Sequence, residues 1–448
     1  MLITDADIVT GGTSTQILAG HAVLVSGGYI REIGPTAQLE QQYPKVRRLD
    51  AQGQLLLPGG ICAHTHFYSA FARGMAIPPP APKDFPEILE RLWWPLDGAL
   101  SEEDVRISAL LSLADAIRHG TTTLFDHHAS SSFVDGSLDV IADAVEKSGL
   151  RAVLCYEVTD RNGSNGADAG IRENVRFLKR LTAQPSSHLA GCFGLHASLS
   201  LSGATLQASR AAVPEGVGFH IHVAEHEQDQ YDSLHKTGLR VVERLNNHGI
   251  LGDRTIAAHC VHVDASEISI LGSSHTWVAH QPRSNMNNGV GAAPVESMLR
   301  AGIPVCLGND GFSNAMWEEW KAAYLLHKAM SRDPRRMDGG VVYDLAIGNN
   351  ARLAGAYFPT APIGEIVQGA VADLMLVDYH APTPFTAGNL PWHVIFGFEP
   401  GMVTSTICGG KVLMKDRELT TLDQDAIAAR ARQLAPRVWK RYEENLRR

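Results

Sequence analysis

Short apolar segments and helix-compatible segments alternate through the middle of this chain of 448 residues, and no other feature restricts its possible folds as much. The apolar segments have the length and composition of buried strands. Stretches with helical spacing, such as 102–119 and 137–148, separate most of them. Strands that alternate with helices build parallel sheets, and eight such units close into a (β/α)8 barrel. We therefore predict an α/β fold with a TIM-type barrel, whose strands would be residues 57–66, 121–126, 151–157, 189–196, 218–223, 255–260, 276–280 and 303–308.

The two ends of the chain have a different pattern, of short strands joined by turns. Residues 1–57 contain a hairpin signal with a Gly-Gly turn, and residues 371–414 contain similar strands and another Gly-Gly turn. Neither piece can bury a core alone. We expect Pro436 to kink or restart a C-terminal amphipathic helix. The domain prediction is a small discontinuous β-sandwich of residues 1–57 plus 364–420, a barrel of residues 58–363, and a helix of residues 421–448 packed on the domain.

Composition narrows the class of protein. Hydrophobic residues make up 44% and charged residues 19%, as in ordinary globular enzymes. The net charge of −9 argues against a nucleic-acid partner, because such proteins are usually basic. No apolar run approaches the ~20 residues of a membrane span, and the N-terminus does not resemble a signal peptide. The six cysteines form no CxxC pair, which is typical of a reducing compartment. We expect a cytoplasmic protein with neither nucleic-acid nor membrane partners.

The strongest chemical signal is the pair His64 and His66, which ends the first predicted barrel strand after a Pro-Gly-Gly turn. Side chains alternate faces in a strand, so both imidazoles point the same way. Two such imidazoles can form half of a metal site, although a pair of hydrogen-bonded core histidines is the alternative. Other candidates come at the ends of later predicted strands, where catalytic groups of a barrel converge. These are His222 and Glu225 after the fifth strand, His259 after the sixth and Asp310 after the eighth, with His220 as a rival ligand to His222.

These residues could hold and use one divalent metal. His64, His66, His222 and Asp310 would supply its ligands and leave a position for water. A divalent metal lowers the pKa of a bound water to about 7, which provides hydroxide at neutral pH. Glu225 could carry protons without being a ligand. Three histidines and one aspartate suit Zn²⁺, and also Fe²⁺, Mn²⁺ or cobalt.

Taken together, these motifs and the segment 364–374 resemble the amidohydrolase superfamily, over nearly the whole chain. Within it they resemble the mononuclear-metal branch of deaminases and chlorohydrolases, which includes cytosine, guanine and 8-oxoguanine deaminases and triazine hydrolases. A closer similarity, to the SsnA-type aminohydrolases associated with purine metabolism, rests on residues 64–69, 92–94, 126–130 and 283–288.

The resemblance implies a role for each residue. His64, His66, His222 and Asp310 would be the metal ligands, and Asp310 would also take a proton from the metal-bound water. Glu225 would protonate a ring nitrogen and then the leaving amine, while His259 would orient the hydroxide or stabilise the developing charge. His196 matches a substrate-contacting histidine. No lysine ends the fourth predicted strand, so one metal is expected. Because relatives are commonly dimers, we expect a homodimer that acts on a small heterocycle and water.

The sequence leaves alternatives open for the other candidate substrate contacts. His127 and His128 are adjacent, so only one can face inward, and His128 is the prediction. Arg73 could meet a carbonyl or carboxylate of the substrate, or be a solvated loop residue. Arg283 and the asparagines near it could bind ring heteroatoms or form a turn. The proline-rich loop 78–82 could be a lid or a surface connection.

The leading functional hypothesis is hydrolytic deamination of an aminated nitrogen heterocycle of the purine, pterin or triazine type. It depends on Glu225, because an amine leaves more readily once the ring and the amine are protonated. The enzymatic alternative is dechlorination, or opening of a cyclic amide, on a similar ring. A catalytically silent relative is the third hypothesis, and the complete set of candidate ligands argues against it.

Overall fold

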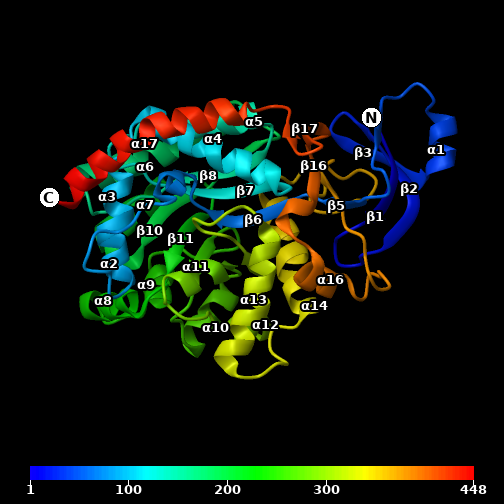
Figure 1. The fold of residues 1–448 in the computed structure, drawn as a ribbon. Helices are drawn as coiled ribbons and strands as arrows, with labels where there is room; N and C mark the ends of the chain where they lie inside the picture. The colour runs from blue at the N-terminus through cyan, green and yellow to red at the C-terminus, as the bar shows by residue number, and fades with distance from the viewer. Residues whose placement is uncertain (448) are drawn as a thin grey trace.

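Eight parallel strands form a ring at the centre of the computed structural model, which describes residues 1–447 (Figure 1). Together with one further short strand, β9, they make up a four-stranded and a five-stranded sheet. Single parallel bridges, Val158 with Leu195 and Thr65 with Asp310, join the two sheets at both edges. The predicted TIM-type barrel is therefore confirmed. Its strands are β6 (Gly60–Thr65), β7 (Thr121–His128), β8 (Arg151–Tyr156), β10 (Phe193–Ala197), β11 (Phe219–Val223), β12 (Ile256–His259), β13 (Trp277–His280) and β14 (Val305–Leu307).

Two of the predicted barrel strands are divided in the structure. The segment predicted as 57–66 ends one strand, β5 (Leu55–Pro58), before β6 begins. Gly59 separates them, and a Cβ there would lie 2.3 Å from Thr122 Oγ1, so no other residue fits this turn. The segment predicted as 189–196 is likewise two strands, β9 (Leu189–Gly191) and β10. Both errors came from treating a continuous apolar run as one strand.

Helices surround the barrel and follow its strands. The first long one begins with a capping box, in which Ser101 and Asp104 satisfy free backbone N–H groups. Within residues 1–447, no helix combines the length and the apolar composition that crossing a bilayer requires. The helices of this layer are α4 (Glu102–Arg118), α5 (Ser137–Ser148), α6 (Gly163–Ala183), α7 (Gly203–Ala212), α8 (Glu227–Thr237), α9 (Val241–Asn247), α10 (Ala265–Ser273), α11 (Pro282–Asn287), α12 (Val295–Arg300), α13 (Met316–Ser331), α14 (Gly339–Tyr343) and α15 (Asn350–Tyr357).

The two terminal segments combine in one nine-stranded sheet beside the barrel, which forms the small β-domain. They meet where β5 pairs antiparallel with β15 (Leu374–Val377), with Leu56 opposite Leu376. Both side chains lie in a core that residues from both termini share. The domain limits themselves stay a prediction. The other elements are β1 (Leu2–Val9), β2 (Ile17–Ser26), β3 (Tyr29–Pro35), α1 (Thr36–Gln42), β4 (Arg48–Asp50), α16 (Leu390–Gly397), β16 (Val403–Cys408), β17 (Lys411–Lys415) and β18 (Glu418–Leu419).

The chain ends in the long helix α17 (Gln424–Leu446), which lies along α4 and reaches α3 (Trp94–Asp97) (Figure 1). Its buried residues, Ile427, Leu434, Val438 and Tyr442, follow helical spacing and form one face. We expected Pro436 to kink or restart the helix; it lies inside one continuous helix, so the helix does not restart there, and the kink stays a prediction. Pro436 is exposed, where water can bond the backbone carbonyl that loses its N–H partner.

A buried ion pair connects the barrel to the terminal sheet. Arg151 on β8 contacts the carboxylate of Asp373, just before β15, and both are nearly inaccessible to solvent. Asp373 Oδ1 also accepts a hydrogen bond from Gly409 N at 2.7 Å. Because the guanidinium stays charged, loss of the carboxylate charge leaves a buried cation without a partner.

We therefore expect Asp373→Asn to lower the free energy of unfolding by about 3 kcal/mol, since breaking a buried pair leaves the remaining charge uncompensated. Equilibrium urea unfolding would measure this effect. Asp378→Asn, at an exposed position after β15, is the matched control and should change stability by less than about 1 kcal/mol. Equal stability of the two variants would contradict this role of the pair.

Candidate active site

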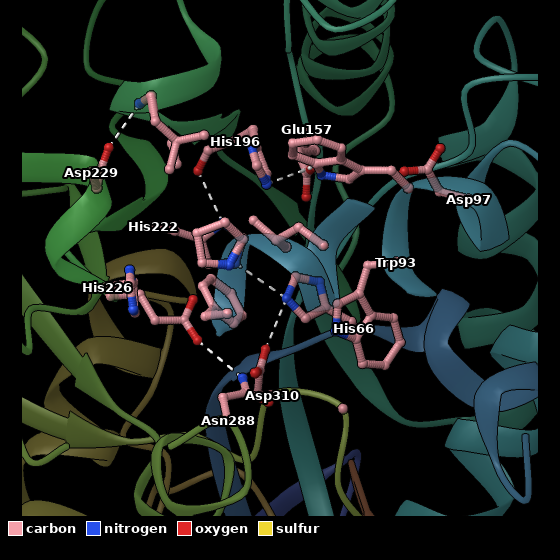
Figure 2. A pocket seen from close by; sticks show the side chains of 18 of the residues that line it. His66, Trp93, Asp97, Glu157, His196, His222, His226, Asp229, Asn288 and Asp310 are labelled. Atoms are coloured by element: carbon pink, nitrogen blue, oxygen red, sulfur yellow. Dashed lines mark hydrogen bonds and ion pairs between the residues drawn. The ribbon is translucent and has the colours of Figure 1, made fainter. Parts of the chain in front are cut away.

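A cavity opens at the carboxyl ends of the barrel strands, with about 750 Å³ of space not filled by protein atoms (Figure 2). Its floor carries His66, His222, Glu225 and Asp310. Apolar and aromatic side chains form much of the wall, and three buried acidic side chains, Asp97, Glu157 and Asp229, interrupt it. Ligand sites of barrel enzymes lie at this end of the strands. The wall residues are Tyr68, Phe85, Pro86, Leu89, Trp93, Trp94, Asp97, Glu157, His196, Ala197, Leu199, His226, Asp229, Asn288 and Gly311.

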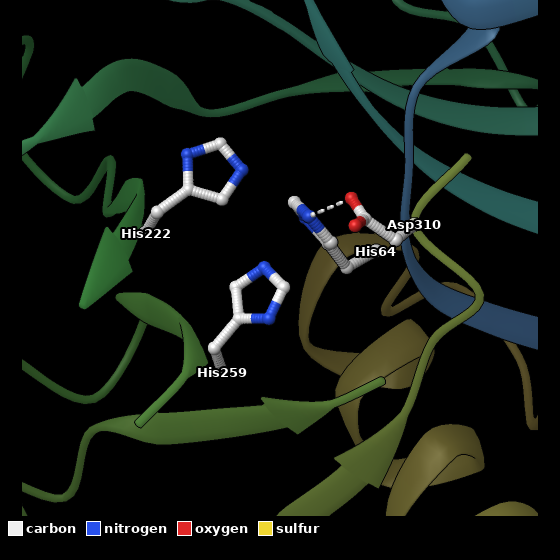
Figure 3. Close-up of side chains that lie close together, drawn as sticks. All are labelled: His64, His222, His259 and Asp310. Atoms are coloured by element: carbon white, nitrogen blue, oxygen red, sulfur yellow. Dashed lines mark ion pairs between the residues drawn. The ribbon is translucent and has the colours of Figure 1, made fainter. Parts of the chain in front are cut away.

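Imidazole nitrogens and one carboxylate converge at the floor, and Figure 3 shows four of the side chains. Ligand atoms of His64, His222, His259 and Asp310 all lie within 4.8 Å of one another. Asp310 Oδ1 is 3.3 Å from His64 Nε2 and 2.9 Å from His66 Nε2. His66 Nε2 is in turn 3.2 Å from His222 Nε2. The structure thus brings the four predicted ligands together, with His259 beside them.

Hydrogen bonds from the Nδ1 atoms fix the orientation and the tautomer of these rings. His66 Nδ1 donates to the carbonyl of His127 at 2.6 Å, and His222 Nδ1 donates to the carbonyl of His196 at 2.9 Å. With the proton on Nδ1, the lone pair of each Nε2 is free to face the centre of the cluster. His64 Nδ1 lies 2.8 Å from His220 Nε2, so His64 can follow the same pattern by donating to His220. In this arrangement His220 orients the ring of His64 through a hydrogen bond, which argues against His220 as the rival ligand to His222.

The buried cluster fits a divalent metal. Among the described residues, His64 Nε2 and His259 Nε2 are buried and have no hydrogen-bond partner. A buried polar atom without a partner costs free energy, unless a ligand such as a metal completes the site. Several imidazole nitrogens with one carboxylate are the donor set of a divalent transition metal. The donor set is therefore that of a divalent-metal site.

The backbone around the cluster is strained at the strand ends. His259 and Asp310 have φ angles of 70° and 58°, and Ala224, next to Glu225, has a φ of 44°. Residues other than glycine rarely adopt this left-handed region, and such strain is concentrated at functional sites. A Cβ on Gly308 would lie 2.7 Å from backbone atoms of His64, so only glycine allows the chain after β14 to approach β6 this closely. The close approach places Asp310 against His64 and His66.

The two carboxyl groups on the floor hold their protons differently. Burial raises the pKa of Asp310, but its close contacts with His64 and His66 outweigh burial and hold that pKa well below its usual range. Burial and the negative charge of Asp310 raise the pKa of Glu225 well above its usual range. Glu225 contacts His259 Nε2 at 3.4 Å and accepts a hydrogen bond from Asn288 Nδ2 at 3.1 Å. The floor therefore combines a carboxyl group whose pKa is lowered with one whose pKa is raised.

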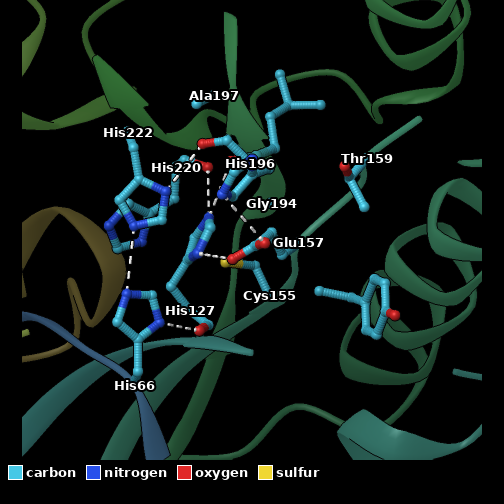
Figure 4. A network of polar contacts seen from close by, with 12 residues as sticks. His66, His127, Cys155, Glu157, Thr159, Gly194, His196, Ala197, His220 and His222 are labelled. Atoms are coloured by element: carbon cyan, nitrogen blue, oxygen red, sulfur yellow. Dashed lines mark hydrogen bonds and ion pairs between the residues drawn. The ribbon is translucent and has the colours of Figure 1, made fainter. Parts of the chain in front are cut away.

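Glu157, which was not predicted as a site residue, organises one wall of the cavity (Figure 4). Its carboxylate lies 3.3 Å from His127 Nδ1 and 3.6 Å from His196 Nε2. Arg161 pairs with both Glu157 and Asp97, at 3.4 and 3.1 Å. Burial raises the pKa of Glu157, but its contacts with His196, His127 and Arg161 outweigh burial and hold that pKa well below its usual range. The only signal in the sequence was its place at the end of the third predicted strand.

The three predicted substrate contacts differ in their position relative to the cavity. His196 lines the cavity, as the prediction required for a contact. His128 does not line it, and its Nε2 is 2.8 Å from Ser130 Oγ. His127 does not line it either; its Nε2 lies 3.0 Å from the carbonyl of Leu195, and the contact through His128 stays a prediction. Arg73 is exposed and lies in a neighbouring hollow, which shares Trp93 and Asp310 with the cavity.

Segments near the cavity resolve two further alternatives. Arg283 pairs with the buried Glu319, whereas Asn285 Oδ1 lies 2.9 Å from His259 Nδ1 and Asn288 bonds Glu225. The asparagines thus hold the proposed catalytic groups, and Arg283 holds α11 to α13. The proline-rich residues 78–82 do not line the cavity, but Phe85 and Pro86 immediately after them do.

Comparison with known proteins agrees with this geometry. Residues 55–413 match the model of the amidohydrolase family. This chain belongs to the amidohydrolase family. Residues 22–45 also match a bacterial imidazolonepropionase-like composite domain. As a member of the amidohydrolases, the chain is a hydrolase that acts on C–N bonds other than peptide bonds.

Several relatives of this amidohydrolase align over almost the full length. The 5-methylthioadenosine/S-adenosylhomocysteine deaminase of Pelotomaculum thermopropionicum is 30% identical over 98% of this chain and 99% of its own length. The 5'-deoxyadenosine deaminase of Methanocaldococcus jannaschii is 30% identical over 92% of this chain and 95% of its own length. Among solved structures, a zinc-bound adenosine deaminase from Xanthomonas campestris superposes with a TM-score of 0.86, at 26% identity and 98% coverage of both chains.

We expect His220→Phe to weaken metal binding about 10- to 100-fold, because it removes the hydrogen bond that orients His64 and fixes its tautomer. Competition with a chromophoric chelator would measure the affinity. His327→Phe is the matched control, because His327 is a buried histidine on α13 that contacts His280 at 3.1 Å instead of the cluster. Wild-type affinity in His220→Phe would contradict the supporting role of His220.

Proposed function

We propose that this amidohydrolase deaminates an aminated purine-type heterocycle by hydrolysis. The observation that carries the proposal is the position of Glu225, a buried carboxyl group on the cavity floor. It contacts His259 Nε2 at 3.4 Å, and burial together with the charge of Asp310 raises its pKa, which favours its use as a proton donor. Deamination of a ring needs a group that supplies a proton to the ring nitrogen and to the departing amine.

The proposed mechanism divides the proton transfers between the two carboxyl groups. Asp310, kept ionised by His64 and His66, accepts a proton as the water oxygen bonds to the ring carbon. Glu225 donates its proton to the ring nitrogen next to this carbon. It takes up the second proton of the attacking water. It then protonates the amine, the C–N bond breaks, and ammonia leaves. His259 faces the same point through Nε2 and stabilises the developing charge.

We propose that His64, His66, His222 and Asp310 hold one divalent metal. Their converging Nε2 atoms, the Asp310 carboxylate and the unpartnered His64 Nε2 support this ligand set. Zinc is the metal we propose, since similar solved structures contain zinc. When bound, such a metal acidifies water and so supplies a nucleophile at neutral pH.

The cavity wall supports a planar substrate that carries polar groups. Trp93, Trp94 and Phe85 offer flat apolar surface for a ring, and Asp97 and Glu157 can accept hydrogen bonds from hydroxyl or amine groups. The names of the relatives, deaminases of 5'-substituted adenosines, favour an aminopurine nucleoside within this class. His196, which lines the same wall, is the proposed contact to the ring. The cytoplasmic location and the homodimer stay predictions.

The first experiment measures ammonia release from aminopurine nucleosides, aminopurine bases, pterins and aminotriazines, with protein of known metal content. We expect ammonia from the aminopurines. Glu225→Gln should lower kcat by about 100-fold or more, with unchanged metal content, because the amide cannot relay protons. Glu227→Gln, at an exposed position in the first turn of α8, is the control and should retain activity. Chloride release or ring opening without ammonia would contradict the proposed reaction.

Removal of the metal gives an independent prediction. Dialysis against a chelator should abolish ammonia release, and one equivalent of Zn²⁺ should restore it, because the nucleophile depends on the metal. Metal analysis of wild type, His64→Ala and the exposed control His380→Ala should give about one, no and one equivalent. Full activity after complete removal of the metal would refute the proposed use of the cluster.

A further inference from the structure

The last helix of the chain holds the cavity wall from outside. The wall residues Phe85, Leu89, Trp93, Trp94 and Asp97 all belong to one segment between β6 and α4. This segment is irregular: it contains the one-turn helix α2 (Phe85–Ile88), a π-helical turn (Leu89–Trp93) and the one-turn helix α3. Helices this short cannot supply their own stability, so their position depends on tertiary contacts.

A proline leaves one carbonyl of this segment without its usual partner. Pro95 has no N–H group, so it cannot supply the donor that the carbonyl of Arg91, four residues earlier, would have in an α-helix. The hydroxyl of Tyr442 on α17 donates to this carbonyl at 2.6 Å. A side chain about 350 residues away in the sequence therefore bonds the backbone of the wall segment.

Three more side chains of α17 bond carbonyl groups around the wall. Asn445 Nδ2 donates to the carbonyl of Pro95, in the first turn of α3, at 3.1 Å. Trp439 Nε1 donates to the carbonyl of Phe71 at 2.9 Å, and Arg441 Nε donates to that of Ala99 at 2.6 Å. These bonds hold the beginning, the middle and the end of the segment. Within residues 1–447, no residue of α17 lines the cavity itself.

The catalytic floor is built separately. His64, His66, His222, His259 and Asp310 lie on or directly after barrel strands, whereas Tyr442 and Asn445 bond the wall segment near Trp93 and Trp94. A change at the end of α17 can therefore move the wall without moving the floor. Arg91 extends the same support, because its guanidinium bonds the carbonyls of Pro78 and Pro80 in the preceding loop.

We infer that Tyr442 and Asn445 are positioning residues, which set the place of Trp93, Trp94 and Asp97 through the carbonyls of Arg91 and Pro95 and so control substrate affinity and selectivity. The kinetic consequence of this positioning role rests on the proposed deamination. Loss of the two hydrogen bonds should loosen the wall and weaken binding of the non-reacting part of the substrate. The chemical step should change little, because the floor keeps its geometry.

The test compares wild type with the double variant Tyr442→Phe/Asn445→Ala. We expect KM for the preferred substrate to rise about tenfold, as for the loss of one to two hydrogen bonds, with kcat within about twofold and metal content unchanged. Tyr442→Phe alone removes only the hydroxyl and should give a smaller rise in KM. Arg437→Ala, at an exposed position on the same helix, is the control and should leave KM unchanged.

Hydrogen–deuterium exchange supplies a readout that does not need activity. Residues 85–99 should exchange faster in the double variant than in wild type, whereas β6, β11 and β12 should keep their protection. Unchanged exchange in 85–99 would overturn the inference, even if the proposed reaction is correct. If wild type releases no ammonia from any ring while exchange in 85–99 rises, the proposed function fails and the positioning role stands. A parallel fall in kcat, metal content and barrel protection would show a general structural role and would also overturn it.

Discussion

The arrangement of the centre depends on one constraint: imidazoles from separate strands must present Nε2 lone pairs to a single point. Backbone carbonyls of His127 and His196 meet this constraint by accepting hydrogen bonds from Nδ1–H of His66 and His222. Those carbonyls belong to neighbouring strands, so the register of the barrel decides the chemistry of the ligands. Gly308 completes the arrangement, because only a glycine lets the chain that carries Asp310 approach β6. The fold of the barrel therefore sets the geometry of the proposed metal site.

The same cluster separates the roles of the two acids on the floor. Asp310 lies against His64 and His66, and these contacts hold its pKa low in spite of burial. At Glu225, burial and the charge of Asp310 raise the pKa instead. Two carboxyl groups with opposed environments are a pattern of acid–base catalysis. The wall has a different chemistry, since Asp97 and Glu157 both pair with Arg161, which also stacks over Trp94 at 4.9 Å.

The sequence predicted the residues of the floor better than those of the wall. His64, His66, His222, His259 and Asp310 could be found because strand alternation and strand ends are local signals. Strand alternation puts His127 and His128 on opposite faces of β7, but this local signal does not tell which of the two faces the substrate. Glu157 offered only its position at a strand end. Asp97 offered no signal, because α3 and the π-helical turn before it follow no hydrophobic period.

Pro95 illustrates why such a wall is difficult to predict. A proline inside a helical segment removes a hydrogen bond, so local rules favour a break at this place. The structure instead keeps the chain helical through Trp93 and Trp94, and Tyr442, near the other end of the sequence, bonds the carbonyl of Arg91 four residues before the proline. Natural sequences break local rules mainly at functional sites and compensate for them elsewhere. Here the compensation lies on the exterior of the barrel, so residues that contact no substrate can influence which substrate the cavity accepts.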